Sequence, residues 1–221
     1  MNRIYDIDID KRFSEDDRLR IRKSALGLYK TNCYVLIRDG YALIVDPGFH
    51  PEVIREMIGD AQPVAILLTH GHVDHRAAAG PVAEAYGLPV HIHPKDEELL
   101  YMRRRMPSAY KILFTAETKP LAEGRFKWGP FSVSVLETPG HSEGSVCIAV
   151  DRVLLTGDTL FKGTAGRVAG YDGAGADLKR SLERLASLPG DYLILPGHAE
   201  YTTLEAERQY NPHLKGEAHE D

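Results

Sequence analysis

The 221-residue sequence has little cysteine and no long apolar run. Its two cysteines, Cys33 and Cys147, each lie in an apolar, strand-like stretch, so we expect two buried thiols rather than a disulfide. No apolar stretch approaches the roughly 18 residues that are needed to cross a bilayer. The N-terminus also lacks the apolar core of a signal peptide. These absences predict a cytoplasmic protein that does not bind membranes.

An excess of positive charge is absent as well. Lys and Arg total 27 against 32 Asp and Glu, which gives a net charge of −5. The run Arg103-Arg104-Arg105 is better explained as a solvated face after a short helix than as a nucleic-acid site. The hydrophobic fraction of 43% is close to the globular average. We therefore expect a folded protein that acts on a small molecule and not on nucleic acid, with its oligomeric state left open.

No linker or low-complexity segment divides the chain, so residues 1–221 are expected to form a single domain. Residues 1–17 are polar and acidic, and we expect them to form a loosely packed leader. Residues 102–124 contain basic residues and two prolines without a clear period, and no role is assigned to them.

Short apolar runs alternate with amphipathic segments, which predicts an α/β fold. Asp39-Gly40 between two apolar runs indicates a hairpin. Its strands and the others are expected at residues 33–37, 41–45, 64–68, 90–93, 131–136, 146–150, 153–156 and 192–195. Helices are expected over residues 51–58, over residues 76–86, and from a cap at Asp177 through Leu188.

Polar clusters directly follow four of the predicted strands. They contain His70, His72, Asp74 and His75 in the first cluster, then His141, Asp158 and His198 in the others. Strand ends are rigid and the loops after them are free to carry function, so these side chains can converge on one point. Glycine precedes each of the last three residues and permits a tight turn there.

Imidazole and carboxylate groups suit zinc and other first-row ions, and each such ion needs about three protein ligands plus water. The available set divides into His70, His72 and His141 for one ion and Asp74, His75 and His198 for the other, with Asp158 left to bridge. Packing alone explains the first cluster poorly, because burying so many ionisable groups without a metal would be costly.

The pattern His-x-His-x-Asp-His, followed by separate His, Asp and His residues after later strands, resembles the metallo-β-lactamase superfamily over about residues 31–214. The stretches LLTHGHVDH, ETPGHSEGSV and LLTGDTLFKGTAGR look most like glyoxalase II (hydroxyacylglutathione hydrolase) and its short relatives. The resemblance implies a four-layer αββα sandwich of two mixed β-sheets. It also implies two divalent metal ions, with Zn²⁺ expected first and iron as the alternative.

The same resemblance implies a hydrolase in which a hydroxide between two metal ions attacks a thioester or related ester, with Asp74 orienting the nucleophile. A lactonase or another ester hydrolase would use the same ligands. Persulfide dioxygenases share the fold but use one iron, and their GRTDF pattern is replaced here at residues 166–170. The helical domain with which glyoxalase II binds glutathione is not expected, since the sequence ends soon after Asn211-Pro212.

A hypothesis from another class is a non-catalytic binding protein on a degenerate hydrolase fold. Such a protein usually loses metal ligands, whereas all seven are present here. His91 and His93 lie two apart on one predicted strand, but no other ligand joins them, so we do not expect them to bind a metal.

Four further residues are candidates around the metals. Asp46, at the end of a strand in Val-Asp-Pro-Gly, is expected to support a metal ligand by a hydrogen bond. His50 is a candidate for the rim of the pocket. Arg167 lies on a glycine-rich loop after Asp158, and we predict that it binds an anionic part of the substrate. Tyr171 lies near the position of a family tyrosine and is a third substrate-binding candidate.

Overall fold

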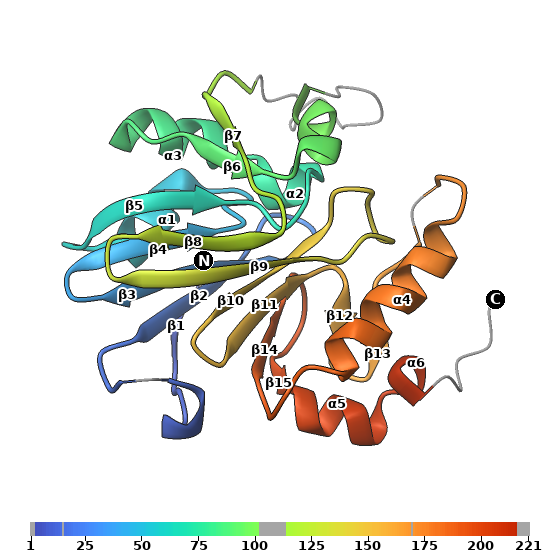
Figure 1. Cartoon of the computed structure of the whole chain (residues 1–221). Helices are drawn as coiled ribbons and strands as arrows, with labels where there is room; N and C mark the ends of the chain where they lie inside the picture. The colour runs from blue at the N-terminus through green and yellow to red at the C-terminus, as the bar shows by residue number, and fades with distance from the viewer. Residues whose placement is uncertain (1–2, 15, 102–113, 169, 216–221) are drawn as a thin grey trace.

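The structure is a computed structural model that describes residues 3–14, 16–101, 114–168 and 170–215. Two β-sheets lie face to face, and helices cover the outer side of each sheet (Figure 1). Sheet A has the strand order β1-β2-β3-β4-β5-β6-β7, and sheet B has the order β15-β14-β11-β10-β9-β8. Each sheet contains parallel and antiparallel pairs, so the predicted αββα sandwich of two mixed sheets is confirmed.

The strands of sheet A are β1 (Ile4–Ile7), β2 (Arg20–Leu26), β3 (Thr31–Arg38), β4 (Tyr41–Val45), β5 (Gln62–Leu67), β6 (Val90–Ile92) and β7 (Thr118–Pro120). Those of sheet B are β8 (Gly124–Trp128), β9 (Phe131–Glu137), β10 (Val146–Val150), β11 (Val153–Gly157), β14 (Leu193–Pro196) and β15 (Thr202–Thr203). A small hairpin joins β12 (Leu160–Phe161) and β13 (Thr164–Ala165). The helices are η1 (Lys11–Phe13), α1 (Pro51–Ile58), α2 (Val73–Arg76), α3 (Ala79–Tyr86), η2 (Pro94–Tyr101), α4 (Ala174–Ala186), α5 (Leu204–Tyr210) and α6 (Pro212–Lys215), where η marks a 3₁₀ helix.

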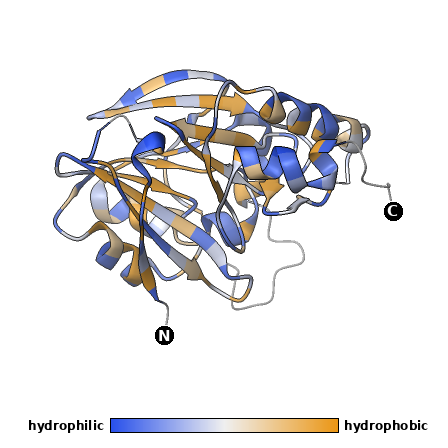
Figure 2. Ribbon diagram, turned by 90° about the horizontal axis from the view of Figure 1, so that it is seen from below, coloured by the Kyte–Doolittle hydropathy of each residue, from blue (hydrophilic) through white to orange (hydrophobic). Residues whose placement is uncertain are grey.

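Three apolar layers hold the sandwich together. The first lies between the sheets, where Leu36 and Leu43 of sheet A share a cluster with Val133 and Ile148 of sheet B. The second joins sheet A to α1 and α3, and the third joins sheet B to α4 and α5. Figure 2 shows hydrophobic residues concentrated along the strands, while the helices carry many hydrophilic ones. Strand β3 is buried along its whole length because apolar layers cover both of its faces.

The predicted hairpin is confirmed between β3 and β4, where Arg38 pairs with Tyr41. Asp39 and Gly40 both have positive φ angles, of 51° and 79°, as the favoured two-residue hairpin turn requires. Cys33 and Cys147 are buried free thiols, also as predicted. Burial raises the pKa of the Cys147 thiol to about 12, so this sulfur is a poor nucleophile near neutral pH.

The prediction of a loosely packed leader is wrong for the part of residues 1–17 that the structure describes. Residues Ile4–Ile7 form β1, which pairs with β2 along its length. Ile7 and Phe13 contribute to the apolar layer between the sheets, and Phe13 is only 3% exposed. Although this segment is acidic, it includes an edge strand whose Ile7 side chain packs in the core.

Two helix predictions also need correction. The helix expected over residues 76–86 is split into α2 and α3, because the Ala78 amide donates to the carbonyls of Pro47 and Gly48, at 2.9 and 2.8 Å. Asp74 therefore lies inside α2 rather than before a helix. Helix α4 begins at Ala174 after the N-cap Gly173, so Asp177 is not its cap. Asp177 lies in the first turn, where a negative charge still favours the helix dipole.

The segment at residues 102–113, including the arginine run, lies outside the described residues. Within the described ranges, no helix is both long enough and apolar enough to cross a membrane.

Candidate metal centre

The predicted ligands lie at one edge of the sandwich, beyond the ends of strands from both sheets. His70 follows β5 of sheet A, while His141, Asp158 and His198 follow β9, β11 and β14 of sheet B. Main-chain hydrogen bonds join the sheets at this edge, from Val146 to the Thr69 carbonyl at 2.8 Å and from Asn32 to the Gly197 carbonyl at 2.7 Å. The fold thereby brings together loops that are far apart in the sequence.

All seven predicted ligands meet in one cluster. Their nitrogen and oxygen atoms form three overlapping groups, each with its atoms within 4.8 Å of one another. The groups are His70, His72 and His141; His70, His75 and Asp158; and Asp74, His75 and His198. The first and third groups are the two sets that the sequence predicted, and Asp158 shares the second group with one member of each set, His70 and His75.

Individual distances show how tightly the ligand atoms converge. Two imidazole nitrogens, His72 Nδ1 and His141 Nε2, are only 2.9 Å apart. His198 Nε2 lies 3.4 Å from Asp74 Oδ2 and also 3.4 Å from Asp158 Oδ2. The remaining Asp158 oxygen, Oδ1, is 3.3 Å from His75 Nε2.

Three atoms in the cluster are buried and have no hydrogen-bond partner in the described part of the chain: His70 Nε2, His75 Nε2 and Asp158 Oδ1. A buried polar atom without a partner is costly in free energy. All three point toward the other ligand atoms, and bound divalent cations would satisfy them. The residues present therefore fit a metal centre.

The cluster also shifts the pKa values of its members. Burial lowers the pKa of His70 well below its usual range. Burial opposes charge on His198, but hydrogen bonds to Asp158 and Asp74 raise its pKa to about 9. Burial opposes ionisation of Asp74 too, yet hydrogen bonds with His198 and Thr31 and the charge of His75 lower its pKa to about 2. Burial also opposes ionisation of Asp158, but the charge of His75 lowers its pKa. Two ionised carboxylates thus face the imidazoles, and this charge favours cations.

Several ligands are held by hydrogen bonds from behind. His75 Nδ1 lies 2.9 Å from Asp46 Oδ2, and Asp46 in turn accepts from the amide and hydroxyl of Thr69, at 2.8 and 2.7 Å. Asp74 accepts a 2.9 Å hydrogen bond from the Thr31 hydroxyl. The structure therefore places Asp46 where the sequence expected it, against a candidate ligand whose other nitrogen faces the cluster.

Residues 26–198 match the sequence model of the metallo-β-lactamase superfamily. The chain belongs to this superfamily. An uncharacterized protein of Mycobacterium leprae is 41% identical over 86% of this chain and 96% of its own length. The probable metallo-hydrolase YqgX of Bacillus subtilis is 35% identical over 90% of this chain and 99% of its own. Hydroxyacylglutathione hydrolase of Xanthomonas campestris is 35% identical over 84% of this chain and 68% of its own.

Solved structures agree with this assignment. The BLEG-1 B3 metallo-β-lactamase superposes with a TM-score of 0.77 at 32% identity, over 89% of this chain and all of that one. The protein TTHA1623, solved in a di-iron-bound form, gives a TM-score of 0.71 at 37% identity, over 85% of this chain and 97% of that one. The metallo-β-lactamase fold implies that this chain binds divalent metal and is an enzyme of the hydrolase type.

One residue of this metallo-β-lactamase site escaped prediction from the sequence. Asp96 is 1% exposed, and its carboxylate accepts hydrogen bonds from the loops that carry His72 and His141. In the sequence it begins the acidic run Asp96-Glu97-Glu98, which is typical of an exposed helix face. Its position directly after Pro94-Lys95, in a segment that looks like the exposed start of a helix, gave no sign of burial.

The predicted substrate-binding residues lie at different distances from the ligands. The Arg167 carbonyl is 2.9 Å from His141 Nδ1, so its main chain is part of the site, and its side chain is exposed. The Tyr171 hydroxyl donates to Asp177 Oδ2 at 3.0 Å. The half-exposed His50 ring lies 3.0 Å from Glu52 Oε1, and no contact with the cluster is seen among the described residues.

The glycines of the Arg167 loop do not share one role. A side chain at Gly166 would place its Cβ 1.7 Å from the Asp158 carbonyl oxygen, so only glycine fits there. Nothing lies within 4 Å of the equivalent position at Gly163 or Gly170.

His91 and His93 lie away from the metal cluster. The His91 ring packs edge-on against Trp128, with centroids 4.9 Å apart. His93 Nε2 contacts Glu137 Oε1 at 3.1 Å. Both rings thus contact side chains outside the cluster.

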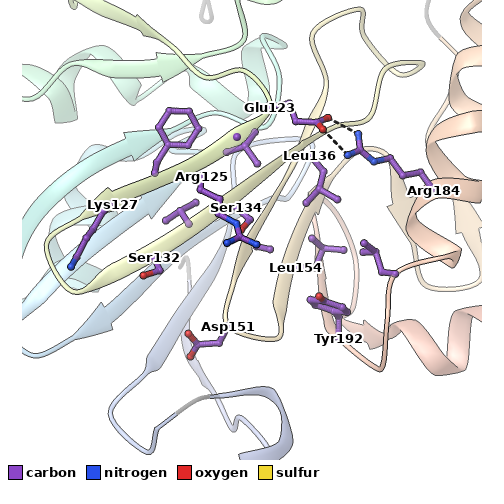
Figure 3. A pocket seen from close by; sticks show the side chains of 16 residues that line it. Glu123, Arg125, Lys127, Ser132, Ser134, Leu136, Asp151, Leu154, Arg184 and Tyr192 are labelled. Atoms are coloured by element: carbon purple, nitrogen blue, oxygen red, sulfur yellow. Dashed lines mark hydrogen bonds and ion pairs between the residues drawn. The ribbon is translucent and has the colours of Figure 1, made fainter.

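A cavity of about 860 Å³ lies on the outer face of sheet B, between β8–β9 and the end of α4 (Figure 3). Arg125, Ser132 and Ser134 line its floor, and Arg184 pairs with Glu123 at its rim. None of the seven predicted ligands lines this cavity. Its size therefore says nothing about the metal centre, which lies at an open edge of the sandwich.

Proposed function

We propose that this chain is a binuclear metal-dependent hydrolase that cleaves a thioester or a related ester. The observation that carries the proposal is the division of seven converging side chains into two groups of three around Asp158. In this proposal His70, His72 and His141 hold the first ion. Asp74, His75 and His198 hold the second, and Asp158 lies between the two.

The metal is proposed to be Zn²⁺, because an imidazole-rich set with few carboxylates suits this ion. Iron is the alternative, since the similar protein TTHA1623 was solved in a di-iron-bound form. Asp46 supports the proposed ligand His75 from behind, and such outer partners fix the orientation of a metal-binding imidazole.

When bound, two divalent ions would supply Lewis acidity and would lower the pKa of a bound water toward neutrality. The side chains of this chain then orient the reactants. Asp74, fixed by Thr31, accepts a hydrogen bond from the attacking water and aims it at the carbonyl carbon. No cysteine is needed as a nucleophile, and both cysteines are buried.

A thioester substrate is supported by the similarity to the hydroxyacylglutathione hydrolase of Xanthomonas campestris. In the proposed complex Arg167 binds an anionic group of the substrate, since its main chain contacts His141 while its side chain reaches solvent. Tyr171 and His50 are proposed as further contacts at the rim. Tyr171 would have to exchange its hydrogen bond with Asp177 for one with the substrate.

The test combines metal analysis with a substrate screen. Gently purified protein is expected to contain two metal ions per chain and to release thiol from thioesters, with lactones assayed in parallel. Asp158→Asn is expected to lower both metal content and turnover. Asp17→Asn is the matched control, because it makes the same chemical change at an exposed aspartate outside the cluster.

Two results would overturn the proposal. One is a single metal equivalent that substitutions of Asp74, His75 and His198 leave unchanged. The other is oxygen consumption with glutathione persulfide in the absence of thioester or lactone cleavage, which would indicate a dioxygenase instead.

A further inference from the structure

Asp96 lies behind the metal centre, between the two loops that carry ligands of the proposed first ion. Its Oδ2 accepts hydrogen bonds from the Gly71 amide at 2.8 Å and from the Ser142 hydroxyl at 2.6 Å. Its Oδ1 accepts from the Gly144 amide at 2.7 Å. Gly71 stands between His70 and His72, and Ser142 directly follows His141. One carboxylate therefore joins the two loops.

Because Asp96 is buried, loss of these hydrogen bonds would be costly in free energy. The residue is 1% exposed, and no ion pair of Asp96 occurs in the ranges that the structure describes. A buried carboxylate is tolerated only where hydrogen bonds replace its hydration, and these three bonds do so. Asp96 thus depends on both loops, and each loop depends on Asp96.

The two glycines beside Asp96 show how closely the loops approach it. A Cβ at Gly144 would lie 2.8 Å from the Asp96 Cγ, and a Cβ at Gly71 would lie 2.7 Å from the Asp96 carbonyl oxygen. Neither position has room for a side chain. The spacing of the loops is therefore set by direct contact with Asp96 rather than by intervening side chains.

The other proposed ion is supported by different residues. His75 contacts Asp46, Asp74 accepts from Thr31, and His198 Nδ1 lies 3.0 Å from the Tyr29 carbonyl. No contact between Asp96 and these ligands is seen among the described residues. Loss of the Asp96 carboxylate is therefore expected to affect one of the two ions selectively.

We propose that Asp96 is a positioning residue that sets the spacing of His72 and His141 and thereby the affinity of the first metal ion. This inference rests on the proposed function, because it assumes that those histidines share an ion. Asp96 itself is 2.7–2.8 Å from main-chain amides and touches neither ion nor substrate in this account.

The decisive variant is Asp96→Asn, which keeps the shape of the side chain. One side of the new amide group carries an N–H donor in place of an accepting oxygen. This donor faces a main-chain N–H that is also a donor, so one of the hydrogen bonds to the loops is lost. Stepwise affinities for Zn²⁺ are measured on the full chain by competition with a chromophoric chelator. His141→Ala and His198→Ala identify which binding step belongs to which ion. We expect the first-ion affinity to fall about 10–100-fold, as for other outer partners of metal ligands, and the second to stay unchanged.

Two further variants keep the test sharp. Glu98→Gln removes the same charge from an exposed position nearby and is expected to change neither affinity. Ser142→Ala removes one donor and leaves the carboxylate in place, so it is expected to weaken the first ion by a smaller factor. If Asp96→Asn does not fold, the first-ion affinity of Ser142→Ala alone tests the proposal.

A merely structural role predicts a different result. It would lower the melting temperature of the metal-free protein and weaken both ions equally, or neither, and that outcome would overturn the proposal. The measurement needs no turnover. A wild-type protein that binds metal without hydrolysing any ester would refute the proposed function alone, whereas unchanged first-ion affinity in an active enzyme would refute only the role of Asp96.

Discussion

Besides His70, whose Nδ1 lies 3.2 Å from Thr69 Oγ1, three histidines of the cluster have one ring nitrogen tied to the protein and the other directed at the metal centre. The tie is a carboxylate for His75 but a main-chain carbonyl for His141 and His198. In each case the hydrogen bond selects the tautomer and fixes the plane of the ring. Carbonyl partners cannot be altered by substituting a side chain, so Asp46 is the partner of these three that mutation can remove without touching a ligand.

The Arg167 side chain provides a prediction about substrate charge. Arg167→Ala leaves in place the carbonyl that contacts His141, so metal content is expected to be unchanged. Loss of a charge-assisted hydrogen bond costs about 1.5–3 kcal/mol, which is roughly a 10–100-fold drop in kcat/KM. This loss is expected with a carboxylate-bearing thioester and should appear mainly in KM.

A neutral thioester of similar size is the control substrate for Arg167→Ala. Steady-state kinetics on both substrates compare the two losses. If they are equal, or if neither substrate is affected, Arg167 does not recognise substrate charge.

Between β11 and α4, the chain returns to the metal centre at Gly166. Gly166→Ala would push a Cβ to 1.7 Å from the Asp158 carbonyl oxygen, so the loop or the aspartate must move. We expect a loss of about 1–3 kcal/mol in unfolding free energy, the usual effect of overpacking, together with weaker metal binding. Urea denaturation and metal titration measure the two effects.

Gly170→Ala is the matched control for the Gly166 loop. It makes the same chemical change in the same loop, where nothing lies within 4 Å. Its effect on stability is expected to stay within about 0.5 kcal/mol. Equal effects of the two substitutions would mean that the loop yields freely at Asp158.

The elements that sequence patterns predicted well are those defined by local chemistry. Short apolar runs predicted most strands, and the Asp39-Gly40 turn followed from its own preference for positive φ angles. The seven clustered side chains were singled out because they lie in segments that follow strands, and the ends of these strands from both sheets meet at one edge of the sandwich. The interactions that determine these features lie within a few residues of the sequence pattern that predicts them.

The elements that patterns missed depend on partners far along the chain. The break between α2 and α3 arises because Ala78 donates to Pro47 and Gly48, about thirty residues earlier. Asp96 looks like part of an exposed acidic run until the loops at Gly71 and Gly144 close over it. A local pattern cannot distinguish such residues from ordinary surface residues.

At the scale of the whole molecule, the proposed metal ions bridge the two sheets. The first ion would join His70 and His72 beyond sheet A to His141 beyond sheet B, and the second would join Asp74 and His75 to His198. Each ion would stabilise the folded chain by about 4 kcal/mol when present at a thousand times its Kd. Removal of metal by a chelator is therefore expected to lower Tm by about 8–16 °C per ion, at about 2–4 °C per kcal/mol.

Thermal unfolding with and without the chelator, followed by restoration with Zn²⁺, measures this stabilisation. Asp158→Asn serves as the comparison, because it is expected to respond less to the chelator. A Tm that stays constant while elemental analysis shows the metal removed would mean that the sheets hold together without the ions.

Main-chain contacts at the end of β14 have a consequence for the order of events in the cell. The Pro196 carbonyl accepts from the Tyr34 hydroxyl at 2.8 Å, and Gly197 accepts from Asn32, so the strand that precedes His198 completes a clamp begun early in sheet A. A ribosome needs on the order of ten seconds to pass from the first histidine motif to this last one. Among the proposed ligands His198 is the last to be synthesised, whereas His70, His72 and His141 all precede β14. The ligand set of the proposed second ion is therefore complete only after synthesis has passed β14, later than the set of the first.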